Sequence, residues 1–214
     1  MSPTLTPADA EALAACIEGG GVAVFPADTV YGLACDPDSA EAVARLYALK
    51  GRAADKPAAI MWFDRGAALA ALPRLGARTR AAVERLTPGG VTLLLPNPGR
   101  LFPLAAGPSG DAATLGVRVP RLPGAAAALG GAGVAVLQSS ANEAGGADAC
   151  SVEDVPAQIR DGADLVLDAG LLPGTPSTVI DLRAYEDAGR HAIVREGAVP
   201  AAEVARSLGI VGRR

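Results

Sequence analysis

The sequence is poor in aromatic residues and has no long apolar runs. Aromatic side chains make up 3% of the 214 residues, so we expect a core built mostly from Ala, Val, Leu and Ile. No apolar run approaches the roughly 20 residues that cross a bilayer, and the N-terminus lacks the basic and apolar blocks of a signal peptide. We therefore expect a cytoplasmic protein without a membrane partner.

Cysteine, histidine and excess positive charge are also scarce. The three cysteines, Cys16, Cys35 and Cys150, are odd in number and far apart, which favours reduced thiols over disulfides or a metal site. The single histidine, His191, has no evident acidic partner, and we expect it to be structural or exposed. A net charge of −4 argues against a surface broadly dedicated to nucleic acid, although a local basic patch remains compatible with it.

What the chain does contain is an alternation of helical segments and apolar strands. Thr6, Pro7 and Asp9 predict the start of a helix that ends at Gly19, and a second helix is predicted from Ser39 to Gly51. Strands are predicted at 22–25, 58–63, 91–95, 115–119, 134–137, 165–167, 178–182 and 192–194. The alternation indicates an α/β fold with a sheet covered on at least one face and some antiparallel pairing late in the chain.

The organisation of the chain points to one domain, residues 1–214. It shows no internal repeat, low-complexity tail or convincing linker. The Gly- and Pro-rich segment 97–111 is expected to be a surface loop, and we expect it to close over a ligand.

Polar side chains cluster where several predicted strands or helices end, and loops at strand ends commonly bind ligands in α/β proteins. The first cluster is a predicted loop after strand 22–25 that carries Asp28, Thr29 and Tyr31, with Gly32 allowing close approach of the backbone to a ligand. A plain turn with a buried Tyr31 is the alternative. The second cluster places Lys50, Arg52 and Lys56 at a helix end, either as a solvated cap or as a site for a polyanion; it is not a P-loop.

Two further clusters follow later strands. Ser139, Ser140 and Asn142 can hydrogen-bond a carboxylate, a phosphate or a base edge, whereas the surrounding sequence is not the elbow of a serine nucleophile. Arg118 stands between two valines in a strand, so it either reaches solvent or meets an anion. Ser177 and Thr178 mark the start of another strand.

Taken in order, these segments resemble the YrdC/TsaC family of threonylcarbamoyl-AMP synthases. The resemblance spans about Leu5 to Val199 and rests on FPADTVYGL, LKGR with DKP, LTPGGVTLLL, GVRVP, SSAN, PSTVID and VREGAV. It implies a twisted mixed parallel and antiparallel sheet with flanking helices and a concave, positively charged cavity. It also implies the short form of the family, without an additional C-terminal domain.

The resemblance further implies a reaction and a set of residues. Family members condense L-threonine, bicarbonate or CO2, and ATP into threonylcarbamoyl-AMP and pyrophosphate, a nucleotidyl transfer that uses Mg²⁺ and feeds the modification of adenosine 37 in tRNA by downstream proteins. It implies Lys50 and Arg52 as catalytic cations, and Thr29, Arg118, Ser140 and Ser177 as threonine-binding residues. Arg52, Lys56, Thr92, Asn142 and Arg195 are the residues implied for ATP, and no metal-ligating side chain is expected.

Some positions depart from the family pattern. Ala27 replaces a usual Thr and should remove a hydroxyl from the cavity mouth, and Gly90 replaces a common Pro. Met61 stands where some members place a threonine-contacting His, and Cys150 where Ser or Thr often contacts ATP. The alternatives are a module that binds tRNA or double-stranded RNA, or a ribosome-maturation factor of the same fold. A third is a paralogue acting on another carbamoyl group, which Thr29 with Arg118 disfavours.

Overall fold

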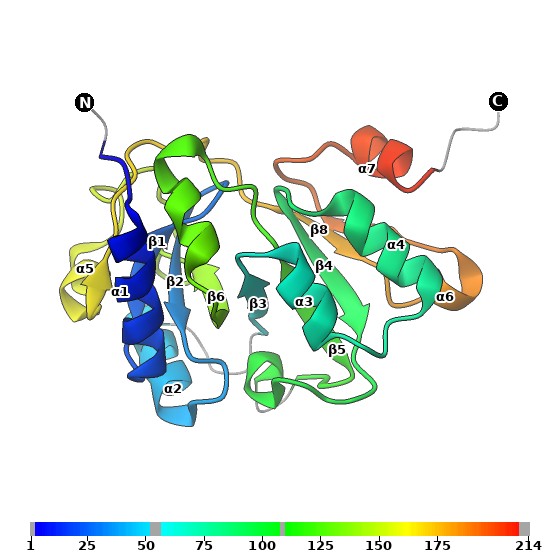
Figure 1. Cartoon of the computed structure of the whole chain (residues 1–214), viewed down its shortest axis with the longest axis horizontal. Helices are drawn as coiled ribbons and strands as arrows, with labels where there is room; N and C mark the ends of the chain where they lie inside the picture. Colours follow the sequence, from blue (N-terminus) through cyan, green and yellow to red (C-terminus); the bar gives the residue numbers. More distant parts are fainter. Residues whose placement is uncertain (1–2, 52–56, 108–109, 210–214) are drawn as a thin grey trace.

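The computed structural model describes residues 3–51, 57–107 and 110–209, and it is built on a single mixed sheet (Figure 1). The strand order within this described part is β7-β1-β2-β6-β3-β5-β4-β8-β9. The strands are β1 (Ala23–Pro26), β2 (Tyr31–Cys35), β3 (Ala59–Trp62), β4 (Val91–Pro96), β5 (Thr114–Arg118), β6 (Ala135–Ser140), β7 (Leu165–Val166), β8 (Thr178–Asp181) and β9 (Ala192–Arg195). The sheet combines parallel pairs (β1 with β7, β3 with β5, β4 with β8) with antiparallel ones, which confirms the predicted mixed α/β class.

All the predicted strands are present with small shifts of their ends. The predicted loop after β1 is confirmed for Asp28 and Thr29, but its extension to Tyr31 and Gly32 is wrong, and Tyr31 is buried as in the alternative of a plain turn. Tyr31 begins β2, which pairs with β1 in an antiparallel hairpin and with β6 on its other side. Gly32 is therefore a strand residue, and a Cβ there would lie 2.9 Å from the ring of Phe25. This glycine allows close packing inside the hairpin and not the approach of a ligand.

Helices flank the sheet on both sides. They are α1 (Pro7–Glu18), α2 (Ala40–Leu49), α3 (Arg65–Ala71), α4 (Ala77–Leu86), α5 (Ala157–Gly162), α6 (Tyr185–Ala188) and α7 (Ala201–Ser207), with 3-10 turns η1 (Pro103–Ala106) and η2 (Gly124–Gly131). The predicted caps are confirmed: Asp9 accepts the N–H of Thr6 at 2.7 Å, and Ser39 accepts the N–H of Ala42 at 3.2 Å. Figure 1 shows α1 beside β1 and β2 in one half of the molecule, and α3 and α4 beside β4 and β5 in the other.

Strand alternation separates the two faces of the sheet. Val91, Leu93 and Leu95 of β4 belong to the larger apolar cluster, together with buried residues of α2 to α7. We call this side the covered face. Thr92 and Leu94, which point the opposite way, belong to what we call the open face.

The open face is covered only in part. Helix α1 and turn η2 pack on it through a second apolar cluster that includes Leu13, Leu129 and Met61, over β1, β2 and the adjacent parts of β3 and β6. The remainder, formed by β5, β4, β8 and the neighbouring ends of β3 and β6, borders a cavity. One face of the sheet thus packs into the larger apolar core, and part of the opposite face forms the floor of the cavity.

The predicted surface loop packs along the rim of this cavity. Asn97 fixes its base, because the side-chain amide donates to Leu101 O at 2.9 Å and to Ala112 O at 3.0 Å. Ala105 and Ala106 are buried and line the cavity. Its closure over a ligand stays a prediction. Among the described residues, no helix combines the length and apolar character needed to span a membrane.

Candidate functional site

The cavity on the open face has a volume of about 500 Å³. Its floor consists of alternate residues of adjacent strands: Thr92 and Leu94 of β4, Thr114, Gly116 and Arg118 of β5, Ala59 of β3 and Val179 of β8. Polar groups stand at both ends of this floor with an apolar stretch between them. The site is therefore a product of strand periodicity, because the odd-numbered neighbours of the β4 and β5 residues lie in the core.

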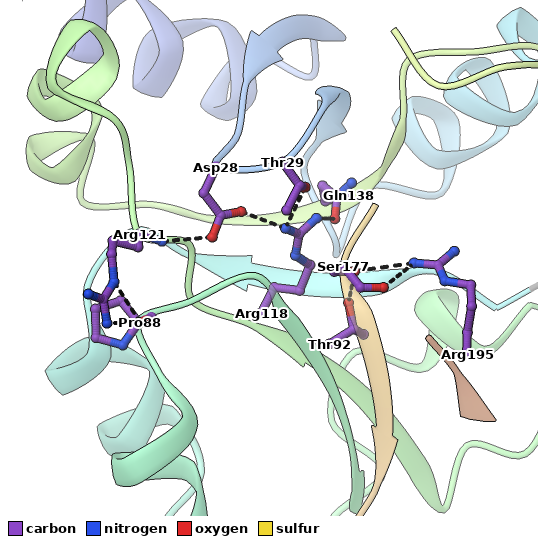
Figure 2. Close-up of polar contacts among 9 residues, drawn as sticks. All are labelled: Asp28, Thr29, Pro88, Thr92, Arg118, Arg121, Gln138, Ser177 and Arg195. Carbon is purple, nitrogen blue, oxygen red and sulfur yellow. Dashed lines mark hydrogen bonds and ion pairs between the residues drawn. The ribbon is translucent and has the colours of Figure 1, made fainter. Parts of the chain in front are cut away.

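A chain of hydroxyl and guanidinium groups forms one end of the cavity (Figure 2). Thr92 Oγ1 and Ser177 Oγ are 2.8 Å apart, joining the paired strand starts of β4 and β8. Arg195 of β9 donates from Nη2 to Ser177 O at 2.8 Å and to Ser177 Oγ at 3.2 Å. The side chain of Ser177 is thereby fixed between a hydroxyl and a cation.

Arg118 lies next to this chain and is 4% exposed. Its Nη2 donates to Asp28 Oδ1 at 2.8 Å and to Thr29 Oγ1 at 3.3 Å, and Nη1 donates to Gln138 Oε1 at 3.4 Å. Within the described part of the chain, the buried Nε of Arg118 has no hydrogen-bond partner. Burial lowers the pKa of Arg118 while the neighbouring Asp28 carboxylate raises it. A buried arginine with an unused donor at a cavity wall is suited to bind an anion.

Lys50 joins helix α2 to the turn after β6. Lys50 is 1% exposed, and its ammonium group donates to Ser140 O, to Asn142 O at 2.7 Å and to Asn142 Oδ1 at 2.8 Å. Asn142 Oδ1 also accepts from Ser140 Oγ at 2.7 Å, while its Nδ2 donates to Gly146 O at 2.8 Å. In this arrangement Lys50 and Asn142 hold the turn that presents Ser140 to the cavity.

The structure distributes the predicted site residues over three groups. Arg118, Ser140, Ser177, Thr92 and Arg195 line the cavity. Thr29, Lys50 and Asn142 are buried directly behind that lining and contact it through the hydrogen bonds given above. Arg52 and Lys56 lie outside the described residues. The ligand of each residue stays a prediction.

Two departures from the family pattern lie in the core. Ala27 is 1% exposed and packs in the second apolar cluster, so the expectation that it faces the cavity mouth is wrong. Met61 pairs in register with Arg118 but is fully buried in the same cluster. Position 61 is thus adjacent to Arg118, and methionine supplies no hydrogen-bond donor there.

The other two departures lie closer to the site. A Cβ at Gly90 would come within 3.3 Å of Thr29 Cγ2 and 3.0 Å of Ala198 Cβ, so glycine permits the tight packing behind Arg118. The Cys150 side chain stands beside Gly174, and its sulfur is 4.0 Å from Asp148 O. Cys150 contributes no side chain to the described cavity lining.

Sequence reasoning missed the polar groups at the far end of the cavity. Asp111 and Thr114 are linked by a 3.0 Å hydrogen bond, and Arg183, which pairs with Asp181, stands next to Thr114. The available signal was strand alternation, because Thr114 and Arg118 lie four positions apart in one strand and their side chains therefore point to the same face. The charged side chains of the described lining are Arg118, Arg183, Arg195, Asp111 and Asp148. An overall positive cavity stays a prediction, since Arg52 and Lys56 are not described.

Comparisons with known proteins agree with this architecture. The family model Sua5/YciO/YrdC, described as "Telomere recombination", matches residues 15–197. A curated threonylcarbamoyl-AMP synthase of Chromohalobacter salexigens is 37% identical over 182 residues, which cover 83% of this chain and 94% of the relative.

Solved structures provide two further likenesses. The crystal structure of P. abyssi Sua5 in complex with L-threonine has a TM-score of 0.82 and 26% identity over 97% of this chain; the match spans 59% of that longer protein. The E. coli YciO structure has a TM-score of 0.78 at 24% identity, covering 95% of this chain and 96% of YciO, and shows the fold. The family model and the curated relative together establish that this chain belongs to the Sua5/YciO/YrdC family.

Proposed function

We propose that the protein is a threonylcarbamoyl-AMP synthase. It condenses L-threonine, bicarbonate or CO2, and ATP to threonylcarbamoyl-AMP and releases pyrophosphate, which makes it a nucleotidyltransferase. The observation that carries the proposal is the pairing of buried Arg118 with the Thr92–Ser177–Arg195 chain at one end of the cavity. The named relatives support this chemistry, and they give no support to the RNA-binding alternative.

Threonine occupies the Arg118 end in this proposal. The unused Nε of Arg118 and its charge suit the amino-acid carboxylate, while Ser177, next to the start of β8, and Ser140, at the end of β6, supply hydroxyls to the cavity lining. Thr29 stands behind Arg118 and accepts its Nη2. Because Thr29 is buried, we propose that it mainly orients the Arg118 guanidinium and that it also contacts the side chain of the bound threonine.

ATP binds next to the threonine in this proposal. Thr92, Arg195 and the turn held by Asn142 border the phosphates, and Lys50 adds positive charge behind that turn. Arg52 and Lys56, which lie outside the described residues, are proposed as further ATP-binding cations. Mg²⁺ would enter with the ATP and would supply charge neutralisation at the phosphates. The described residues fit such a cation, because Asp148 of the cavity lining offers a carboxylate oxygen, the kind of ligand that Mg²⁺ takes.

Chemistry proceeds by bringing anions together. The threonine amine attacks CO2 to form a carbamate and a released proton, or reacts with bicarbonate to form the carbamate and water. A carbamate oxygen then attacks the α-phosphorus of ATP, and the bond to the departing pyrophosphate breaks. The cavity holds the reactants side by side, and its arginines offset the repulsion between carboxylate, carbamate and phosphates. We assign no general base. The product passes to the proteins that modify adenosine 37 of tRNA.

The test is pyrophosphate release by the purified protein with ATP, Mg²⁺ and bicarbonate. We expect release that requires bicarbonate and prefers L-threonine over L-serine, L-valine and no amino acid, with threonylcarbamoyl-AMP detected by mass spectrometry. Arg118→Ala is expected to abolish the threonine-dependent release, because the amino-acid carboxylate loses its cation, and Asp164→Asn, at an exposed ion pair remote from the cavity, serves as the matched control. A folded sample that releases no pyrophosphate under these conditions, and instead binds RNA, would contradict the proposal.

A further inference from the structure

Asp28 is a buried carboxylate that joins two loops at one end of the cavity. Its side chain and that of Arg118 are each 5% exposed, and Oδ1 accepts from Arg118 Nη2 at 2.8 Å. Oδ2 accepts the main-chain N–H of Arg121 at 2.9 Å. Arg121 in turn donates from Nη2 to Pro88 O at 3.1 Å (Figure 2). Asp28 is therefore anchored by a backbone contact that is independent of Arg118.

This anchorage determines how Arg118 presents its donors. Nη2 is directed to Asp28 and Thr29, and Nη1 makes only a long contact to Gln138. Nε is the donor that is left unpaired in the described part of the protein. A planar guanidinium held at one nitrogen by a fixed carboxylate cannot rotate freely, so its remaining edge keeps one orientation.

Charge also requires a partner at this place. Burial disfavours the charged form of Arg118, and the positive charge of Arg195 disfavours it as well. The Asp28 carboxylate favours the charged form. An arginine buried next to a second cation without a carboxylate would tend to turn toward solvent or toward another acceptor. Asp28 thus secures both the position and the charge of Arg118.

We propose that Asp28 is the positioning residue that sets the carboxylate-binding geometry of Arg118 and thereby the affinity for the amino-acid substrate. Asp28 touches no substrate and acts through Arg118. The inference rests on the proposed function, in that the ligand at Arg118 is an amino-acid carboxylate. The inference goes beyond the proposed function by assigning a role to an acidic residue in a site that binds anions.

The sign of the effect distinguishes positioning from simple electrostatics. If only net charge mattered, removing the Asp28 carboxylate would strengthen binding of an anionic ligand. If Asp28 positions Arg118, the same change weakens binding, because the ordered donor edge is lost. Asp28→Asn keeps the size of the side chain and removes its charge, so it separates the two.

The experiment compares wild type, Asp28→Asn and Asp164→Asn for binding of L-threonine and of L-threoninamide, which lacks the carboxylate, and for steady-state kinetics. For Asp28→Asn we expect a KM for threonine about tenfold higher, with kcat at saturating threonine and KM for ATP within about twofold of wild type. The preference for threonine over threoninamide should fall by the same factor of about ten. Asp164→Asn should match wild type in all of these values.

Two outcomes would overturn the inference while leaving the proposed function intact: tighter threonine binding by Asp28→Asn, or an unchanged preference for threonine over threoninamide. If Asp28→Asn does not fold, Asp28→Glu takes its place. It keeps the charge but displaces the carboxylate by one methylene, and is expected to show the same selective loss. Failure of the wild type to bind threonine or release pyrophosphate would instead refute the proposed function.

Discussion

At the scale of single residues, neighbours in one strand serve different purposes because their side chains point to opposite faces. Ser177 lines the cavity, whereas Thr178 is fully buried and its Oγ1 donates to Val199 O at 2.7 Å and accepts Val199 N–H at 3.0 Å. Two adjacent hydroxyls thus provide a matched pair of variants.

Ser177→Ala should raise the KM for threonine about tenfold, since a hydrogen bond to a charged partner contributes about 1.5–3 kcal/mol. Thr178→Val should leave that KM unchanged and lower the unfolding free energy by about 1–3 kcal/mol, because the Val199 backbone groups lose their partner. Steady-state kinetics and urea unfolding of both variants check this. Equal effects of the two changes on KM would contradict the assignment of Ser177.

The thiol of Cys35 offers a second prediction. Burial, with a smaller contribution from Asp36, raises the pKa of Cys35 to about 12. A raised pKa keeps the thiol protonated at all lower pH values, and the thiolate is the reactive form. Iodoacetamide at pH 8 should therefore leave Cys35 unmodified in the native protein. The same reagent should modify Cys35 in the urea-unfolded protein. Peptide mass spectrometry measures both, and fast native labelling of Cys35 would exclude this burial.

The sequence predicted part of the site because some residues carry their own signal. A cation between two valines, Arg118, had to meet an anion or reach solvent, and the structure supplies both a carboxylate partner and a cavity wall. The contacts of Lys50 were not predictable, since its acceptors lie 90 and 92 residues away. Sequence spacing shows that a cation exists, whereas only the tertiary fold decides which carbonyl groups it meets.

At the scale of elements, helix α4 shows a tertiary substitute for a local cap. Its N-cap is Gly76, which has no side chain to cap the helix, and Glu186 of α6 accepts the N–H of Thr79 at 2.8 Å in its place. These hydrogen bonds hold the pKa of Glu186 below its ordinary value. A Cβ at Gly76 would overlap the carboxyl group of Glu186.

Gly76→Ala should therefore displace this cap and lower Tm by about 2–4 °C, the size of shift expected for the loss of one helix cap in a chain of this length. The folded-state pKa of Glu186 is depressed, so its contribution is present above the unfolded value and is lost as the pH falls through the folded one. The penalty should accordingly be larger at pH 7 than at pH 3. Gly124→Ala, where a Cβ meets no atom within 4 Å, is the control in calorimetry, and an equal shift there would contradict the cap.

Element prediction succeeded where apolar runs are bounded by turn residues and failed at β2. Residues 31–35 contain a glycine and follow β1 after a very short turn, so local composition favours a loop. Pairing with β1 and β6 overrides that preference, because the strand is fully buried between them. Strand propensity is a weak guide when most of the stabilisation comes from neighbours.

At the scale of the whole molecule, both apolar clusters are built on one sheet, and each includes buried residues of the four strands β1, β2, β3 and β6. We therefore expect residues 1–214 to unfold as one cooperative unit. Fluorescence of the single tryptophan, Trp62, and far-ultraviolet circular dichroism should give the same urea midpoint. Separated transitions would indicate two folding units.

ATP with threonine, each at about 100 times its Kd, should raise that urea midpoint, since a ligand at this excess adds about 2.7 kcal/mol to the free energy of unfolding.

The alternation in β4 and β5 has a consequence for how this protein can change. Even-numbered positions such as 92, 94, 114 and 116 face the cavity, while odd-numbered ones such as 93, 95, 115 and 117 form the core. A library randomised only at the even-numbered positions would vary the cavity lining, and with it the substrate preference, while the core residues of both strands stay unchanged. A single-residue insertion within either strand would turn the core residues that follow it toward the cavity and the cavity residues toward the core. We therefore expect these two strands to tolerate substitutions at the cavity positions but not changes of strand length.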